Sequence, residues 1–168
     1  MKKVMYVMMF VVTSFTMNSC SAENAVKEEF ENVITDETLV VNYNYSNEEL
    51  ELMKLINEYR KSIGLNALEK INHISYKCQE HNKYMIKNNV MNHDNFDSRA
   101  KNIMKLVKAT SIAENVAHKY NTPQAALSGW LNSSAHKVNI EGDYTHFGIA
   151  VTADASGQKY YTNIFVKI

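Results

Sequence analysis

The stretch Ala-Glu-Asn-Val-Ala at residues 113–117, Thr122-Pro123, and Trp-Leu-Asn-Ser-Ser-Ala-His at residues 130–136 decides the fold of this chain. The first segment is predicted to be a short strand. Thr122 before Pro123 is a typical helix start, because proline suits the first helical position, and the predicted helix runs to about Ser133. The middle of the chain is therefore predicted to hold one strand followed by one helix.

Upstream of this stretch the pattern is helical. Ser46 and Glu49 form a capping-box signature, apolar residues then recur at helical spacing, and Gly64 supplies a stop. A second helical pattern covers about residues 73–89, and a short third helix is predicted from 97 to 107.

Downstream of residue 144 the period changes to that of strands. Residues 146–152 and 159–168 are rich in β-branched and aromatic side chains, and Asp-Ala-Ser-Gly at 154–157 is typical of a hairpin turn between them. Helices first and a closing hairpin after the strand at 113–117 predict an α+β domain over residues 46–168.

The N-terminus is predicted to be an export signal. Lys2 and Lys3 precede a mostly apolar run over residues 4–16, which is too short for an ordinary membrane-spanning helix. Ser19 directly before Cys20 is similar to a lipobox, in which the cysteine is diacylated and becomes the mature N-terminus. Residues 1–20 are thus interpreted as a lipoprotein signal ending at Cys20, which would anchor the protein to a membrane of the cell envelope, outer membrane or cell surface. Plain secretion is the alternative.

Charge separates a tether from the domain. Residues 21–45 contain six acids and one base, a composition that indicates a solvated acidic tether. The stretch at 38–41 is an exception, because Thr-Leu-Val-Val could form a short strand or pack on the domain. From residue 46 onward there are 15 bases and 12 acids, without a basic stripe, so nucleic acid is not an expected partner.

The cysteine content predicts that the fold is held by its hydrophobic core and not by a disulfide. If Cys20 carries lipid, only Cys78 remains, and no intramolecular disulfide can form. Cys78 lies in the predicted helix at 73–89, with no neighbouring pattern that would lower its pKa, so it is expected to be a small buried apolar side chain.

Five segments in order resemble one known family. They are Ile-Asn-Glu-Tyr-Arg at 56–60, Met-Asn-His at 91–93, the segments at 113–117 and 130–136 quoted above, and Phe-Gly-Ile-Ala at 147–150. Together they are similar to the bacterial branch of the CAP superfamily, which includes cysteine-rich secretory proteins, antigen 5 and pathogenesis-related proteins. The resemblance covers nearly all of residues 50–168. It implies a three-layer α-β-α sandwich with a central antiparallel sheet.

The resemblance also implies a cleft. Carried over by motif, its histidines are His93 and His136 and its acid is Glu114. Ser133 stands where many eukaryotic members have a second glutamate, and Ala113 stands where glycine is usual. Residues 135–137 are Ala-His-Lys where bacterial relatives usually have Gly-His-Arg. The predicted set is therefore two histidines and one carboxylate.

Two classes of function follow from that set. Two imidazoles and a carboxylate form a reasonable zinc site, with His93, His136 and Glu114 as ligands and an open position for water. One hypothesis is an envelope binding module whose cleft can hold a divalent metal, with a lipid, glycan or protein as ligand. The alternative is a metal-dependent hydrolase with Glu114 as third ligand or general base. The missing second acid favours the binding module, and whether the protein is an enzyme stays open.

Other residues near these motifs have structural interpretations. Ser133 and Ser134 close to His136 could suggest a serine nucleophile, but serines near a helix end usually satisfy backbone groups. Trp130 is expected in the core. Asn115 and Asn139 are expected to hydrogen-bond loop backbone around the cleft.

Overall fold

The structure is a computed structural model that describes residues 38–168. The predicted export signal, Cys20 and most of the predicted tether lie outside these residues. The helices are α2 (Asn47–Ser62), α3 (Asn72–Asn88), α4 (Phe96–Val107), α5 (Pro123–Leu131) and α6 (Ser134–Ile140). The strands are β1 (Glu69–Lys70), β2 (Ser111–His118), β3 (His146–Ala153) and β4 (Lys159–Lys167). No helix within the described range is long and apolar enough to cross a membrane.

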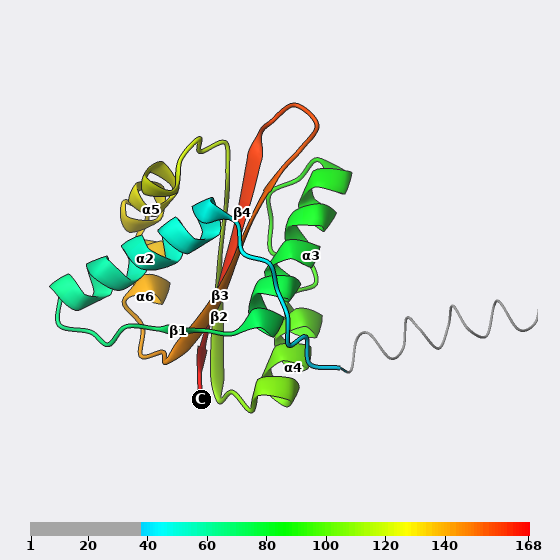
Figure 1. Cartoon of the computed structure of the whole chain (residues 1–168). Helices are drawn as coiled ribbons and strands as arrows, with labels where there is room; N and C mark the ends of the chain where they lie inside the picture. Colours follow the sequence, from blue (N-terminus) through cyan, green and yellow to red (C-terminus); the bar gives the residue numbers. More distant parts are fainter. Residues whose placement is uncertain (1–37) are drawn as a thin grey trace, which may run out of the picture. The chain divides into compact units, whose positions relative to one another are not determined.

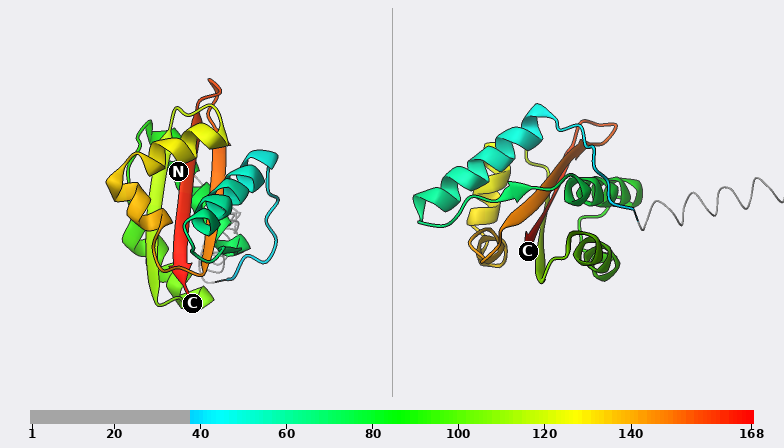
Figure 2. Two further views of the ribbon diagram at one scale, coloured as in Figure 1. Left: turned by 90° about the vertical axis from the view of Figure 1, so that its left-hand side faces the viewer. Right: turned by 60° about the horizontal axis from the view of Figure 1, so that its bottom comes forward.

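The elements form three layers. The sheet lies between α2, α5 and α6 on one side and α3 and α4 on the other (Figure 1). Its strand order is β1-β3-β4-β2, so β2 runs along one edge (Figure 2). The three long strands are antiparallel, which confirms the predicted α-β-α sandwich and the closing hairpin. The two-residue β1 pairs in parallel with β3 and is too short to leave a sequence pattern.

Helix α2 begins at the predicted capping box. The Ser46 side chain accepts from the Glu49 N–H, and the Glu49 carboxylate accepts from the Ser46 N–H. Glu49 is buried and also accepts from the Val151 N–H of β3 at 3.0 Å and from the Tyr43 hydroxyl at 2.8 Å. One carboxylate therefore joins the start of α2 to the sheet and to the segment before the helix.

The packed domain begins before the predicted boundary at residue 46. The Val40 N–H donates to His73 Nδ1 at 3.2 Å, and Asn72 Nδ2 donates to the Val41 carbonyl at 2.6 Å. The part of the predicted tether that is described, residues 38–45, therefore contacts α3. The apolar run at 38–41 packs on the domain because its backbone finds polar partners on α3.

Helix α3 packs closely on the sheet. Cys78 is fully buried, as predicted, and burial raises the pKa of its thiol well above the ordinary value. Its Sγ donates to the Gly148 carbonyl of β3 at 3.4 Å. A Cβ at Gly148 would lie 2.4 Å from the Ser75 backbone nitrogen, so only glycine allows α3 to approach β3 this closely.

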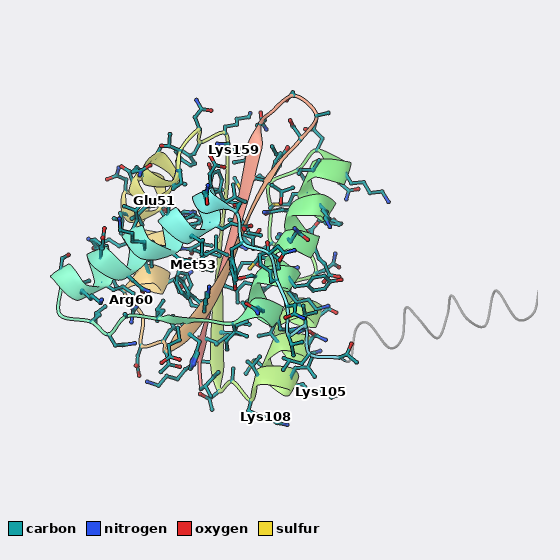
Figure 3. The ribbon with its side chains drawn as sticks, in the orientation of Figure 1. Glu51, Met53, Arg60, Lys105, Lys108 and Lys159 are labelled. Carbon is teal, nitrogen blue, oxygen red and sulfur yellow. The ribbon has the colours of Figure 1, made fainter. Side chains whose placement is uncertain are left out.

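The helix predicted from Pro123 to about Ser133 ends earlier, at Leu131, and a separate helix α6 follows. Trp130 is buried as expected, and its Nε1 donates to the Val116 carbonyl of β2 at 3.2 Å. Arg60 reaches from α2 toward α6 (Figure 3), where its Nη1 donates to the carbonyls of Ile140 at 2.7 Å and Gly142 at 2.9 Å. This fully buried guanidinium satisfies the carbonyls at the end of α6.

Candidate functional site

Three side chains form a chain of contacts at the edge strand. His93 lies between α3 and α4, Glu114 in β2 and Arg99 in α4. His93 Nδ1 is 2.9 Å from Glu114 Oε1. Arg99 donates from Nε to Oε2 and from Nη2 to Oε1 of the same carboxylate, both at 2.8 Å. The Glu114 side chain is 1% exposed, so its charge is balanced inside the protein by Arg99.

These contacts determine which ring nitrogen of His93 carries the hydrogen and which one has the free lone pair. An ionised carboxylate only accepts hydrogen bonds, so Nδ1 of His93 carries the hydrogen. In the neutral ring, Nε2 then holds the lone pair, and it makes no hydrogen bond within residues 38–168. The His93 side chain is 50% exposed.

His136 is the second histidine of the predicted cleft. Its Nδ1 is 2.8 Å from Ser133 Oγ. Burial, and then the nearby His93, lower the pKa of His136, which favours a neutral ring at neutral pH. Ser133 precedes α6 but its side chain does not cap the helix, so the expectation that it satisfies backbone groups is wrong. The Ser133 hydroxyl instead contacts the imidazole of His136, three residues further along the chain.

Two asparagines hold the backbone around His136, although their backbone partners lie in α6 and β2 and not, as was predicted, in a loop. Asn115 Nδ2 donates to the His136 carbonyl at 3.0 Å. Asn139 Nδ2 donates to Asn115 Oδ1 at 2.8 Å and reaches the Glu114 carbonyl at 3.4 Å. The amides therefore tie α6 to β2 and fix the place of His136 relative to the edge strand.

The donor set fits a two-imidazole site better than a three-ligand site. Among residues 38–168, no group of three or more His, Cys, Asp or Glu side chains is arranged to hold a metal ion. Both oxygens of Glu114 already accept hydrogen bonds, and a carboxylate behind a histidine is the usual orienting partner of a metal-binding imidazole. Zinc at this cleft stays a prediction, with His93 and His136 as its nitrogen donors.

A pocket of about 260 Å³ adjoins His136. Its walls come from β2, α5, α6 and the loops around them: residues 116–118 together with Met91, Tyr120, Gly129, Trp130, Ser133 and His136. Tyr120 packs directly against Gly129. A Cβ atom at position 129 would lie 2.1 Å from the tyrosine hydroxyl, so glycine allows this contact. The lining is largely aromatic and apolar, with the imidazole and the serine hydroxyl at one side.

A second, more polar pocket of about 210 Å³ lies between α3 and α4 and includes His81 and Arg99 but neither cleft histidine. His81 is buried, and its Nε2 lies 2.8 Å from the Asn92 carbonyl. Burial, and then the positive charge of Arg99, lower the pKa of His81.

The His81 environment predicts a stability that depends on pH. Its folded-state pKa lies below the unfolded value of about 6.5. The unfolded chain therefore binds the proton first, and stability present above pH 6.5 is lost as pH falls through the folded pKa. We expect the urea midpoint to decrease between pH 7.5 and 5, and to decrease less in His81→Gln. Parallel pH profiles of the two proteins would contradict this assignment.

Sequence reasoning missed Arg99. The residue lies in the helix predicted at 97–107, where a charged side chain ordinarily faces solvent. Arg99 lies six residues from His93 and fifteen residues from Glu114, and these spacings match no sequence motif. Only the packing of α4 against β2 shows that it is buried and paired with Glu114.

Comparison with known proteins gives matches of several kinds. The model of the cysteine-rich secretory protein family, CAP, matches residues 53–166. The uncharacterized membrane protein YlbC of Bacillus subtilis is 32% identical over 123 residues, which are 71% of this chain and 34% of that protein. This chain thus spans about a third of that relative's length.

Solved structures share the fold. An outer surface protein of Borrelia burgdorferi superposes with a TM-score of 0.65 at 20% identity, over 76% of this chain and 98% of that one. An extracellular protein containing a SCP domain from Bacillus anthracis superposes with a TM-score of 0.64 at 24% identity, over 76% of this chain and 45% of that one. The family match covers more than half of the sequence and agrees with the α-β-α layers and the positions of the five motifs. This chain therefore belongs to the cysteine-rich secretory protein (CAP) family.

Proposed function

We propose that this protein is a binding module of the cell envelope, either anchored by lipid on Cys20 or secreted, that binds its ligand at the cleft of His93 and His136. The location is supported by relatives that are named as extracellular, outer-surface or membrane proteins. The lipid anchor is supported by the sequence around Cys20. A lipid, glycan or protein is the class of ligand that this location offers.

The proposal rests on how the polar groups of the cleft are hydrogen-bonded. The buried carboxylate of Glu114 is bound by Arg99 and His93, whereas Nε2 of each histidine makes no hydrogen bond in the described part of the chain. Such a site offers two fixed nitrogen donors to a ligand. A zinc ion held by His93 and His136 would supply a Lewis acid to a bound oxygen atom.

The alternative of a metal-dependent hydrolase is less supported by these contacts. It needs Glu114 as third ligand or general base, and a base must be able to take a proton from water. Arg99 donates to both oxygens of the carboxylate and the Glu114 side chain is 1% exposed, so Glu114 is poorly placed to contact a bound water. Ser133 does not replace the missing acid, because a hydroxyl does not act as a general acid near neutral pH.

Zinc titration by calorimetry tests the metal part of the proposal on the full chain, purified in mild detergent at pH 7.5. We expect one-to-one binding that is lost in His93→Ala/His136→Ala, because these rings supply the two donors. His146→Ala, which changes a histidine outside the cleft, is the matched control and should bind as the wild type does. Binding no tighter than about 1 mM, or binding that survives in the double variant, would exclude a zinc site at this cleft.

A further inference from the structure

The polar pocket of about 210 Å³ lies between α3 and α4, which cover the same side of the sheet (Figure 1). Its walls follow one face of each helix: Lys77, Glu80, His81 and Tyr84 on α3, and Ser98 and Arg99 on α4. Residues at i, i+3, i+4 and i+7 share a helix face, so α3 presents a stripe of polar side chains to the pocket.

The groups that can carry charge in this lining are buried and paired. The Lys77 and Arg99 side chains are each 8% exposed, and His81 is 2% exposed. Lys77 Nζ lies 3.0 Å from the Glu80 carboxylate, and Arg99 lies 2.7 Å from that of Glu114. The two cations are thus matched by two carboxylates. While His81 is neutral, these groups give the site no net charge, which favours a neutral ligand.

His81 contributes an acceptor that has no donor. A carbonyl only accepts hydrogen bonds, so the 2.8 Å contact of Nε2 with the Asn92 carbonyl places the ring hydrogen on Nε2. In the neutral ring Nδ1 then has the lone pair, and no group among residues 38–168 donates to it. The buried, unpaired side-chain atoms in that range are His118 Nδ1 and Asn163 Oδ1, so Nδ1 of His81 touches solvent space. The pocket is the space that this side chain lines.

Arg99 contributes a donor beside this acceptor. Its Nη1 carries two hydrogens, and one of them is directed to the Asp94 carbonyl at 3.3 Å. The other has no acceptor in the described part of the chain. A ligand that satisfies both groups must therefore donate to Nδ1 of His81 and accept from Nη1 of Arg99.

These requirements select a hydroxyl group. A fully ionised anion has no hydrogen to donate to Nδ1. A cation there would meet the positive charge of Arg99, which together with burial already lowers the pKa of His81. A neutral hydroxyl both donates and accepts, and it adds no charge to a site whose ion pairs balance.

The size of the pocket and its aromatic wall limit the ligand further. A cavity of about 150 Å³ accommodates benzene, so about 210 Å³ is sufficient for one six-membered ring with its substituents. The Tyr84 and His81 rings are stacked, with centroids 5.9 Å apart and planes inclined by 12°. The Tyr84 hydroxyl is held by Asp94 at 2.7 Å, which fixes the ring as a flat wall.

We propose that this pocket binds one neutral pyranose unit of a glycan, with a sugar hydroxyl donating to Nδ1 of His81 and a sugar oxygen accepting from Nη1 of Arg99. A pyranose has hydroxyls around its edge and C–H groups on its faces. This distribution matches polar groups placed for orientation beside the aromatic ring of Tyr84. The pocket contains neither His93 nor His136, so the inference goes beyond the proposed function and does not depend on a metal ion at the cleft.

Nitrogen spectra of the histidine rings in the ¹⁵N-labelled full chain test the proposal at pH 7.5, with EDTA and a detergent that has no sugar headgroup. The probes are the methyl pyranosides of glucose, galactose, mannose and N-acetylglucosamine. We expect at least one of them to move the Nδ1 resonance of His81 upfield, because the lone pair then accepts a hydrogen bond. The expected Kd is on the order of 1–10 mM, since a single sugar has few atoms. Tetrahydropyran, the same ring without hydroxyls, should leave the resonance in place, and His81→Gln identifies it.

A matched pair of variants tests the location. Ser98→Phe places a large side chain in the pocket wall and should abolish pyranoside binding. Ser128→Phe makes the same change at an exposed serine of α5, outside the pocket, and should bind as the wild type does. Both serines are exposed, so both variants are expected to fold, which their amide spectra show directly.

Acid titration distinguishes a hydroxyl donor from an anionic ligand. Burial, the positive charge of Arg99 and, more weakly, His93 lower the pKa of His81, whereas Glu114 and the Asn92 carbonyl raise it. Protonation places a hydrogen on Nδ1 and removes the acceptor. Pyranoside affinity should therefore decrease as pH falls through the His81 transition seen in the same spectra. Inorganic phosphate, the anionic probe, would instead bind more tightly to the protonated ring.

Three outcomes would overturn the proposal. The first is that no pyranoside at about 50 mM moves the His81 Nδ1 resonance. The second is that tetrahydropyran, glycine or phosphate binds more tightly than every pyranoside, which would assign the pocket to an apolar, zwitterionic or anionic ligand. The third is pyranoside binding that survives in Ser98→Phe or strengthens in acid. Zinc binding without pyranoside binding would leave the metal cleft and remove only this inference, and pyranoside binding without zinc binding would do the reverse.

Discussion

Replacing Arg99 by leucine is expected to lower the free energy of unfolding by about 3–5 kcal/mol. The Arg99 and Glu114 side chains are 8% and 1% exposed, and the guanidinium makes two hydrogen bonds to the carboxylate. Without Arg99, the carboxylate stays buried with only His93 as a partner. Urea denaturation at pH 7.5, monitored by circular dichroism, measures the effect.

The double variant Arg99→Leu/Glu114→Leu separates lost pairing from lost packing. Removing both charges of a buried pair is often neutral, because the desolvation cost disappears together with the attraction. We therefore expect the double variant to recover most of the stability lost in Arg99→Leu. If the double variant is no more stable than Arg99→Leu, Arg99 contributes to stability through its packing in α4. The unpaired charge of Glu114 is then not what destabilises the single variant.

Replacing Gly148 by alanine is expected to lower the free energy of unfolding by at least about 3 kcal/mol. The added Cβ would lie 2.4 Å from the Ser75 backbone nitrogen and 2.6 Å from the Ile74 backbone carbon. Backbone atoms of α3 cannot turn aside as a side chain can, so α3 must separate from β3. The urea midpoint measures the loss, and an unchanged midpoint would contradict the close approach of these elements.

Gly129→Ala is the matched control for this substitution. Its Cβ would also meet a neighbour, the Tyr120 hydroxyl at 2.1 Å, but that atom is at the end of a side chain that can rotate away. Alanine also favours a helix over glycine by about 1 kcal/mol, and Gly129 lies inside α5. We expect Gly129→Ala to change the unfolding free energy by less than about 1 kcal/mol, since the two effects oppose each other.

Much of the fold followed from local pattern. The capping box at Ser46, the proline start at Pro123 and the hairpin over residues 154–157 depend on neighbours in the chain, and the structure has all three. The burial of Cys78 and Trp130 was also predicted, because apolar periodicity shows which face of a helix turns inward. The break between α5 and α6 was not predicted, since no glycine or proline marks it.

The candidate site divides in the same way. The family resemblance selected His93, Glu114 and His136, and the structure brings Glu114 to His93 and Ser133 to His136. The resemblance could not show how these groups are paired, because Arg99 reaches Glu114 only after α4 packs against β2. The metal ligands, the ligand of the cleft and the lipid on Cys20 stay predictions.

The sequence by itself determined the α+β class, most element boundaries and the family, because these depend on local periodicity and on ordered motifs; its choice of cleft residues stays a prediction. Only the tertiary structure decided that Glu114 is held by Arg99 and that residues 38–45 pack on α3. It also decided that Trp130 of α5 bonds the outward carbonyl of Val116 at the edge of the sheet. The physical reason is that pairing of buried charges and satisfaction of strand edges depend on contacts between residues far apart in the chain, which leave no period in the sequence.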